Sequence, residues 1–107
     1  MRVGDISNVN KKTVSITLKQ AIEMGEYDEN FLSQFDEWNR LTRNMKWQLI
    51  RKALENKKRA LRLNYAEIFN MLDFSKKPHL AEALKNVEKA IEDLYKDKEK
   101  LFVEYSK

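Results

Sequence analysis

The sequence has no cysteine and only two glycines, one proline and one histidine in 107 residues. Without cysteine there is no disulfide, no thiolate metal site and no cysteine nucleophile, which fits a reducing compartment. So few glycines and prolines disfavour an all-β fold, because its hairpins need tight turns. No apolar run approaches ~18–20 residues, so we expect no membrane span. The N-terminus lacks the apolar stretch of a secretory signal, and the default expectation is cytoplasmic.

The sequence also has few of the patterns that carry catalysis. His79 has Glu82 three residues after it, but no comparable pair on another predicted helix completes a metal site. No serine-nucleophile motif is present, and Gly4 and Gly25 stand alone, so we find no phosphate-binding loop. We expect no metal, no cofactor, no small-molecule substrate and no enzyme. A small enzyme with a site between subunits, using an inward base such as Lys98, is the least favoured alternative.

Two apolar stripes occupy the second half of the chain, each at the three- and four-residue steps of a helical face. The first stripe consists of Trp47, Ile50, Leu54, Leu61, Tyr65, Ile68 and Leu72. The second consists of Leu80, Leu84, Val87, Ile91, Leu94, Leu101 and Tyr105, with Lys98 as a polar interruption that we expect to reach water. If the chain reverses at 73–77, the stripes meet in register, from Leu72 beside Leu80 to Trp47 beside Tyr105.

The register predicts an all-α fold in one domain, 1–107. Its centre is a long antiparallel hairpin of helices at about 45–72 and 78–105. The second stripe widens through Ala81, Tyr95 and Phe102, so it needs more than one neighbour. One or two shorter N-terminal helices would therefore complete a three- or four-helix bundle, and we expect a homodimer to cover what remains.

The N-terminal half contains weaker signals. Residues 1–16 are expected to form an extended or partly ordered arm. Thr17 is a suitable N-cap for a helix at 18–24 that Gly25 ends, and Asp28 caps the next helix. Helical periodicity then continues from 29 to 72. We place a break at 42–44, which gives helices at 29–42 and 45–72; one long bent helix over 29–72 is the alternative.

Charge is distributed unevenly. Residues 26–37, the acidic block, contain Glu26, Asp28, Glu29, Asp36 and Glu37 and no base. Residues 38–64 contain Arg40, Arg43, Lys46, Arg51, Lys52, Lys57, Lys58, Arg59 and Arg62 against Glu55 alone. On a helical wheel Arg40, Arg51, Lys58 and Arg62 fall within about 40° of one another, with Lys52 and Arg59 alongside. This basic face could be a binding surface. It could equally be a solvated outer face, or one whose charge the acidic block neutralises.

The sequence therefore favours a non-enzymatic binding module, a small accessory or adaptor protein acting through protein–protein contacts, with another protein or itself as partner. The alternative is a nucleic-acid-binding protein, with phosphates of DNA or RNA contacted by the basic residues Arg40, Arg51, Lys52, Lys58, Arg59 and Arg62. Trp38 and Trp47 could stack on bases, but both are in phase with the apolar stripes, so we expect packing. Phe69 and Phe74, near the hairpin tip, are further candidate contact residues.

Overall fold

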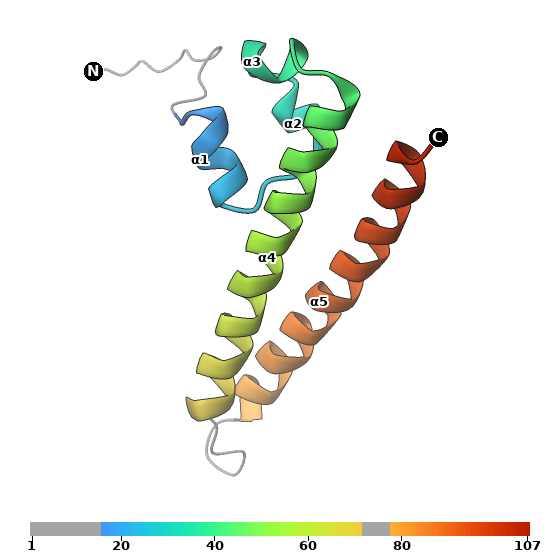
Figure 1. Ribbon diagram of the computed structural model, residues 1–107. Helices are drawn as coiled ribbons and strands as arrows, with labels where there is room; N and C mark the ends of the chain where they lie inside the picture. The colour runs from blue at the N-terminus through green and yellow to red at the C-terminus, as the bar shows by residue number, and fades with distance from the viewer. Residues whose placement is uncertain (1–15, 72–77) are drawn as a thin grey trace, which may run out of the picture.

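The computed structural model describes residues 16–71 and 78–107, so the expected arm, the turn at 73–77, Phe74 and the Leu72–Leu80 pair lie outside the described residues. Five α-helices, and no strand, occur within these ranges (Figure 1). They are α1 (Leu18–Glu23), α2 (Glu29–Leu32), α3 (Asp36–Asn39), α4 (Arg43–Met71) and α5 (Pro78–Tyr105). None of these helices has the length and hydropathy needed to cross a bilayer.

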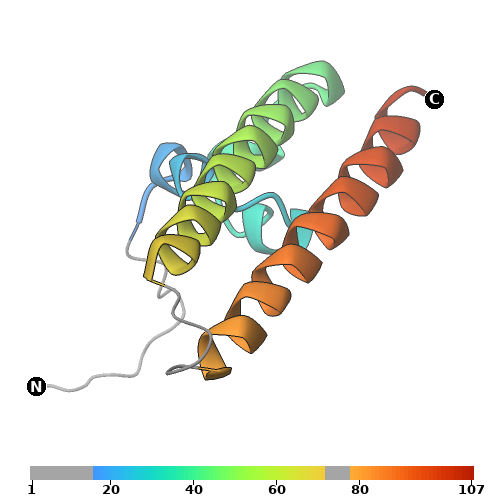
Figure 2. The ribbon, with the colours of Figure 1, turned by 90° about the horizontal axis from the view of Figure 1, so that it is seen from below.

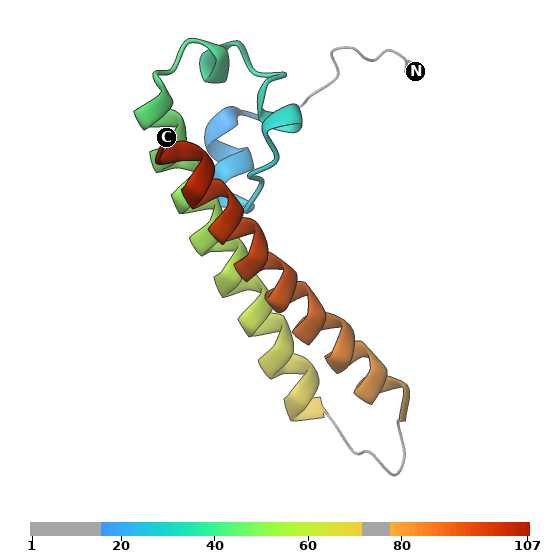
Figure 3. The same cartoon turned by 90° about the vertical axis from the view of Figure 1, so that its right-hand side faces the viewer.

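The predicted antiparallel hairpin is confirmed as α4 and α5, which run side by side along their length (Figures 1 and 3). At one end Trp47 stacks on Tyr105, with ring centroids 5.4 Å apart and an angle of 15° between the planes. Further along, the Tyr65 hydroxyl donates to the Glu88 carboxylate at 3.3 Å. Both contacts match the register that the two apolar stripes predict.

The N-terminal caps follow the sequence signals. The Thr17 hydroxyl accepts from the Gln20 backbone N–H, and the Gln20 side chain accepts from the Thr17 N–H, which forms a capping box at the start of α1. Gly25 lies just beyond α1 with φ +88°, a conformation that glycine adopts without steric cost. Asp28 caps α2 by accepting from the Asn30 N–H at 3.1 Å.

The predicted helix at 29–42 is wrong, because the chain leaves the helical conformation at Phe35. α2 and α3 are separate single turns, and this bend lets Phe31 and Phe35 meet edge to face at 5.7 Å while Trp38 is buried. The alternative of one helix over 29–72 is also wrong. The predicted break at 42–44 is confirmed, since α4 begins at Arg43 and the Thr42 hydroxyl accepts from the Met45 N–H.

The core lies at one end of the hairpin. It joins the N-terminal helices to the first half of α4 and the second half of α5, and consists of Leu18, Ala21, Ile22, Leu32, Trp38, Ile50, Ala53, Leu54 and Leu94. α1 packs on the side of α4 that faces away from α5 (Figures 1 and 2). The N-terminal helices thus gather at this end, and the rest of the hairpin has only two layers of side chains.

Candidate functional site

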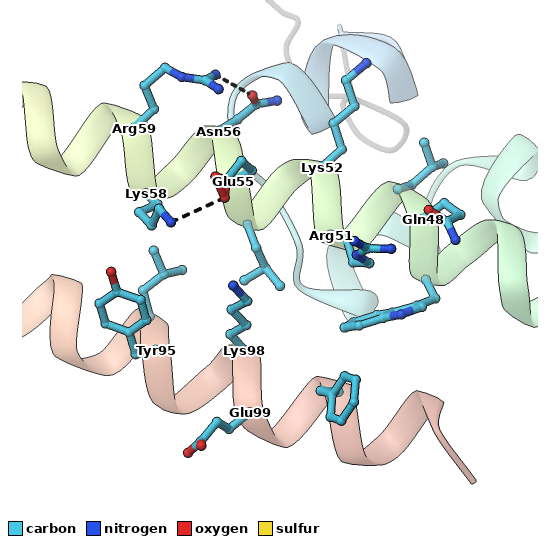
Figure 4. Close-up of a pocket in the computed structure, with 15 residues that line it drawn as sticks. Gln48, Arg51, Lys52, Glu55, Asn56, Lys58, Arg59, Tyr95, Lys98 and Glu99 are labelled. Atoms are coloured by element: carbon cyan, nitrogen blue, oxygen red, sulfur yellow. Dashed lines mark hydrogen bonds and ion pairs between the residues drawn. The ribbon is translucent and has the colours of Figure 1, made fainter.

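A groove of about 1390 Å³ lies between α4 and α5 (Figure 4). α4 contributes side chains from Trp47 to Arg59, and α5 contributes side chains from Leu94 to Phe102. At a rise of 1.5 Å per residue the α4 segment is about 18 Å long, which corresponds to three turns of helix. Positions that hold the hairpin together, such as Trp47, Leu54 and Leu94, therefore also line this hollow.

The floor of the groove is apolar. Leu54 and Leu94 belong to the core and are only 3% and 4% exposed. Trp47, Tyr95 and Phe102 stand beside them; Phe102 is 60% exposed and Tyr95 40% exposed, and the Trp47 and Phe102 rings lie 6.3 Å apart. Large exposed aromatics of this kind gathered beside an apolar floor are typical of an interaction surface.

The groove is rimmed by charge. Its bases are Arg51, Lys52, Lys58, Arg59 and Lys98, and its acids are Glu55 and Glu99. Figure 4 shows Lys98 extending from α5 toward α4, and its side chain is exposed, as expected for a base that interrupts an apolar stripe. Lys58 pairs with Glu55 at 3.5 Å. The rim is thus predominantly positive around an apolar centre.

Four of the six basic residues singled out from the sequence, Arg51, Lys52, Lys58 and Arg59, line this groove. Arg62 lies nearly one turn further along α4 and donates to the Tyr95 hydroxyl at 2.7 Å. Arg40 does not belong to the set. It is the C-cap of α3, and because the chain breaks before α4 begins, the angle that the helical wheel assigned to it does not apply.

The acidic block does not neutralise the basic face through ion pairs. Within residues 16–71 and 78–107 the ion pairs are Lys58–Glu55 and Lys89–Asp93, and neither involves residues 26–37. Two members of the block have other partners: Asp28 caps α2, and Glu29 accepts from the Tyr105 hydroxyl at 2.6 Å. The acidic block therefore does not occupy the bases of the groove, among which Lys58 pairs with Glu55 and Arg59 donates to Asn56.

Tyr105 fixes one end of the groove. Its ring stacks on Trp47 and lies under the Arg43 guanidinium, 4.9 Å from the ring centroid, while its hydroxyl reaches Glu29. Burial and the bond to the Glu29 carboxylate raise the pKa of Tyr105, which keeps the phenol protonated as a donor. Three elements of the fold meet at this one side chain, so the position of Trp47 is well defined.

A second tyrosine attaches the N-terminal segment to α5. The Tyr27 hydroxyl donates to Asp97 at 2.7 Å, and burial together with this bond raises the pKa of Tyr27. Sequence reasoning did not identify this pair, because Tyr27 lies off the helical stripes and seventy residues separate the partners. Sequence reasoning also identified Tyr95 and Phe102 only as a widening of the apolar stripe. Their positions next to Leu94 and Leu101 in the sequence were the feature that could have identified them as groove residues.

The groove combines basic side chains with exposed aromatic rings. Among the side chains described, no three histidines or carboxylates converge as a metal site. Arginine and lysine donors surround exposed aromatic rings, which suits an amphipathic or anionic surface. Comparison with protein-family models, curated proteins and solved structures gives no match for this chain.

Proposed function

We propose that this protein is a cytoplasmic, non-enzymatic binding module, a small accessory or adaptor protein whose α4–α5 groove docks a helical segment of a protein. The observation that carries the proposal is the pairing of an apolar floor at Leu54 and Leu94 with exposed Phe102 and Tyr95. Apolar area left in water at a hollowed surface is the main source of favourable free energy when a partner covers it.

A helix is the occupant that this shape favours. An amphipathic helix places an apolar side chain toward the groove every three or four residues, and its polar flanks then face the rim. The three turns available along α4 accommodate such anchors at i, i+3 or i+4, and i+7. Arg51 and Lys98, on opposite walls, are positioned to meet the flanks of the incoming helix.

The test is site-specific photo-crosslinking in a lysate of the organism that encodes the protein. A photoreactive phenylalanine analogue replaces Phe102, and the matched control places it at Lys96, which is exposed on α5 but does not line the groove. We expect protein adducts from position 102 and at least several-fold fewer from position 96. Equal labelling at both positions, or no protein adduct at 102, would contradict the proposal.

The second candidate is nucleic-acid binding through the same side of α4. One observation favours it: the exposed Phe102 and the adjacent Trp47 lie beside Arg51. Single-strand-binding proteins stack nucleobases on aromatic side chains and hold the phosphate backbone with basic side chains. Arg51, Lys52, Lys58, Arg59 and Arg62 are the phosphate contacts in this candidate function.

This candidate makes a distinct prediction about salt. Affinity for single or double strands should fall steeply between about 50 and 200 mM salt, because phosphate contacts release counterions. Replacement of Arg51, Lys58 and Arg62 by Glu should abolish binding. Absence of binding at low salt, or unchanged binding by this triple variant, removes the candidate, and the crosslinking lysate is run with and without nuclease to separate the two functions.

A further inference from the structure

Charge on the open face of the hairpin is segregated by helix. The open face is the side that carries the groove, and its α4 portion presents Arg51, Lys58 and Arg62, within about 40° on the helical wheel. Its α5 portion presents Glu88, Glu92 and Glu99, also within about 40° of one another. All six are exposed except Lys58, which is half-buried. The α4 side of this face is therefore predominantly basic, with Glu55 as its acid, and the α5 side predominantly acidic, with Lys98 as its base.

The two sets have the same spacing. Along α4, seven residues separate Arg51 from Lys58 and four separate Lys58 from Arg62. Along α5, counted backwards because the helices are antiparallel, seven residues separate Glu99 from Glu92 and four separate Glu92 from Glu88. The hairpin register places Trp47 level with Tyr105, so the levels of Arg51, Lys58 and Arg62 on α5 are 101, 94 and 90. Each acid lies two residues from one of these levels, about 3 Å along the axis.

We infer that the open face docks on the open face of a second copy of this chain. The two-fold axis runs parallel to the hairpin, so that α4 of each copy lies antiparallel on α5 of the other. Each base then faces the acid of the matching step, and symmetry repeats the three pairs. The inference rests on the proposed function, because it assigns an occupant to the same groove.

The alternative symmetric packing is disfavoured by charge. In this alternative the two-fold axis lies in the interface plane but perpendicular to the hairpin. It would place α4 of one copy on α4 of the other, so that Arg51, Lys58 and Arg62 of the two copies face one another. Like charges held across an interface cost several kcal/mol. The parallel axis instead also stacks the exposed rings of Phe102 and Tyr95 on the partner's α4, where they are withdrawn from water.

The size of the face agrees with a stable dimer. α4 contains 29 residues and α5 contains 28. Each helix is about 42 Å long and two side by side are about 20 Å wide, which gives about 800 Å² per copy. Standard-size protein interfaces bury about 800 Å² per partner. The N-terminal helices do not obstruct this face: α1 packs on the side of α4 away from α5 (Figure 2), and Tyr27 bonds to Asp97, about 160° from Glu99 on the wheel of α5.

The test is a charge swap read by analytical ultracentrifugation. The first variant combines Arg51→Glu with Lys58→Glu, and the second combines Glu92→Lys with Glu99→Arg. The wild type should sediment as a dimer, whereas each variant alone should sediment as a monomer. The dimer affinity of each variant should be at least about 100-fold weaker than that of the wild type. An equimolar mixture should restore the two-chain species, because both of its α4–α5 contacts are again complementary.

A matched control reverses two exposed bases further from the open face, Lys19→Glu with Lys100→Glu, and should leave the dimer unchanged. Circular dichroism of every variant checks that the helices remain. The inference is overturned if the wild type sediments as one chain throughout a dilution series, if either charge variant stays dimeric alone, or if their mixture does not associate.

Failure of this inference can be told from failure of the proposed function. A wild type that sediments as one chain, yet forms adducts with a different protein from position 102, loses the self-association and keeps the docking groove. A one-chain wild type without protein adducts loses both. An adduct of two copies of this chain from position 102, together with a dimeric wild type and rescue in the mixed charge variants, supports both the self-association and the docking groove.

Discussion

The two ends of the hairpin differ in how much of the same apolar stripe they bury. At the end covered by α1, α2 and α3, Ile50 is fully buried. At the far end, the stripe members Tyr65 and Ile68 of α4 are only half-buried, and Leu84 and Val87 of α5 are each 8% exposed. The sequence periodicity is similar at both ends. The third layer of helix makes the difference.

Two packed helices bury only the line along which they touch, because each helix has side chains around its whole circumference. A third element converts that line into a core, as Trp38 and Leu32 do around Ile50. The far end has no such cover among the residues that the structure describes. We therefore expect stability to be concentrated at the covered end, and three measurements test this comparison.

The largest expected effect comes from one truncation at each end. Ile50→Ala removes fully buried methyl groups and should lower the free energy of unfolding by about 2–5 kcal/mol. Ile68→Ala, the same change on the same helix at a half-buried position, should cost about 1 kcal/mol or less. Urea denaturation measures both.

Because Ile50→Ala could leave little folded protein, Ile50→Val provides a milder version, with an expected loss of about 0.5–1.5 kcal/mol. Equal losses for the two alanine variants would show that the two ends are equally packed, contrary to the comparison drawn above.

An intermediate effect is expected where the N-terminal segment lies close to the backbone of α4. Gly25 has φ +88°, and a Cβ there would lie 3.0 Å from the Lys57 Cα. Gly25→Ala should therefore destabilise the protein by about 1–3 kcal/mol, through strain in the backbone and displacement of α1 from α4. Thermal unfolding followed by circular dichroism measures it.

Asparagine separates the two causes at this position. It adopts positive φ more readily than alanine, but its Cβ meets the same backbone atoms of Lys57. Gly25→Asn should thus remain clearly less stable than the wild type. A fully stable Gly25→Ala protein would mean that this approach does not hold the covered end together.

The smallest effect is expected from the tyrosine bonds that attach the N-terminal segment to α5. The folded state raises the pKa of Tyr27 and Tyr105, whereas an unfolded tyrosine ionises near 10. The stabilisation is therefore fully present below about pH 10 and is lost as the pH rises further, since the unfolded state then releases protons first. At neutral pH each bond contributes about 1 kcal/mol or less.

The measurement is the free energy of unfolding from about pH 9 to about pH 11 in the wild type and in a Tyr27→Phe, Tyr105→Phe variant. The variant should show a shallower decline, because it lacks two of the groups whose ionisation differs between the two states. An identical slope in both proteins would remove the tyrosines as the cause. Ultraviolet absorbance of the ionised phenols gives an independent reading of their titration.

The hairpin was predictable because its signal is local and repeated. Steps of three and four residues specify a helical face wherever they occur, and two such stripes with one turn between them have one natural register. The caps at Thr17 and Asp28 were predictable for the same reason, since each acts within three residues of itself.

The separation of α2 and α3 was not predictable from periodicity. Phe31, Phe35 and Trp38 follow helical spacing, yet the chain opens at Phe35 because Trp38 has to reach a cavity that other elements create. The groove itself was only partly predictable. Its bases could be found on a wheel, but Arg40 was misplaced because the wheel was continued across the break at 42–44. The contribution of Tyr95 and Phe102 depends on which helix lies opposite.

The tyrosine bonds also bear on how the chain folds. Tyr27 reaches a residue seventy positions away, and Tyr105 reaches one seventy-six positions away, in a protein whose helices otherwise form from neighbours. Contacts that distant in sequence are slow to form, because a long loop has to close before they are made. We therefore expect the far end of the hairpin, where α4 and α5 are closest in sequence, to form first, and the leading segment to dock later.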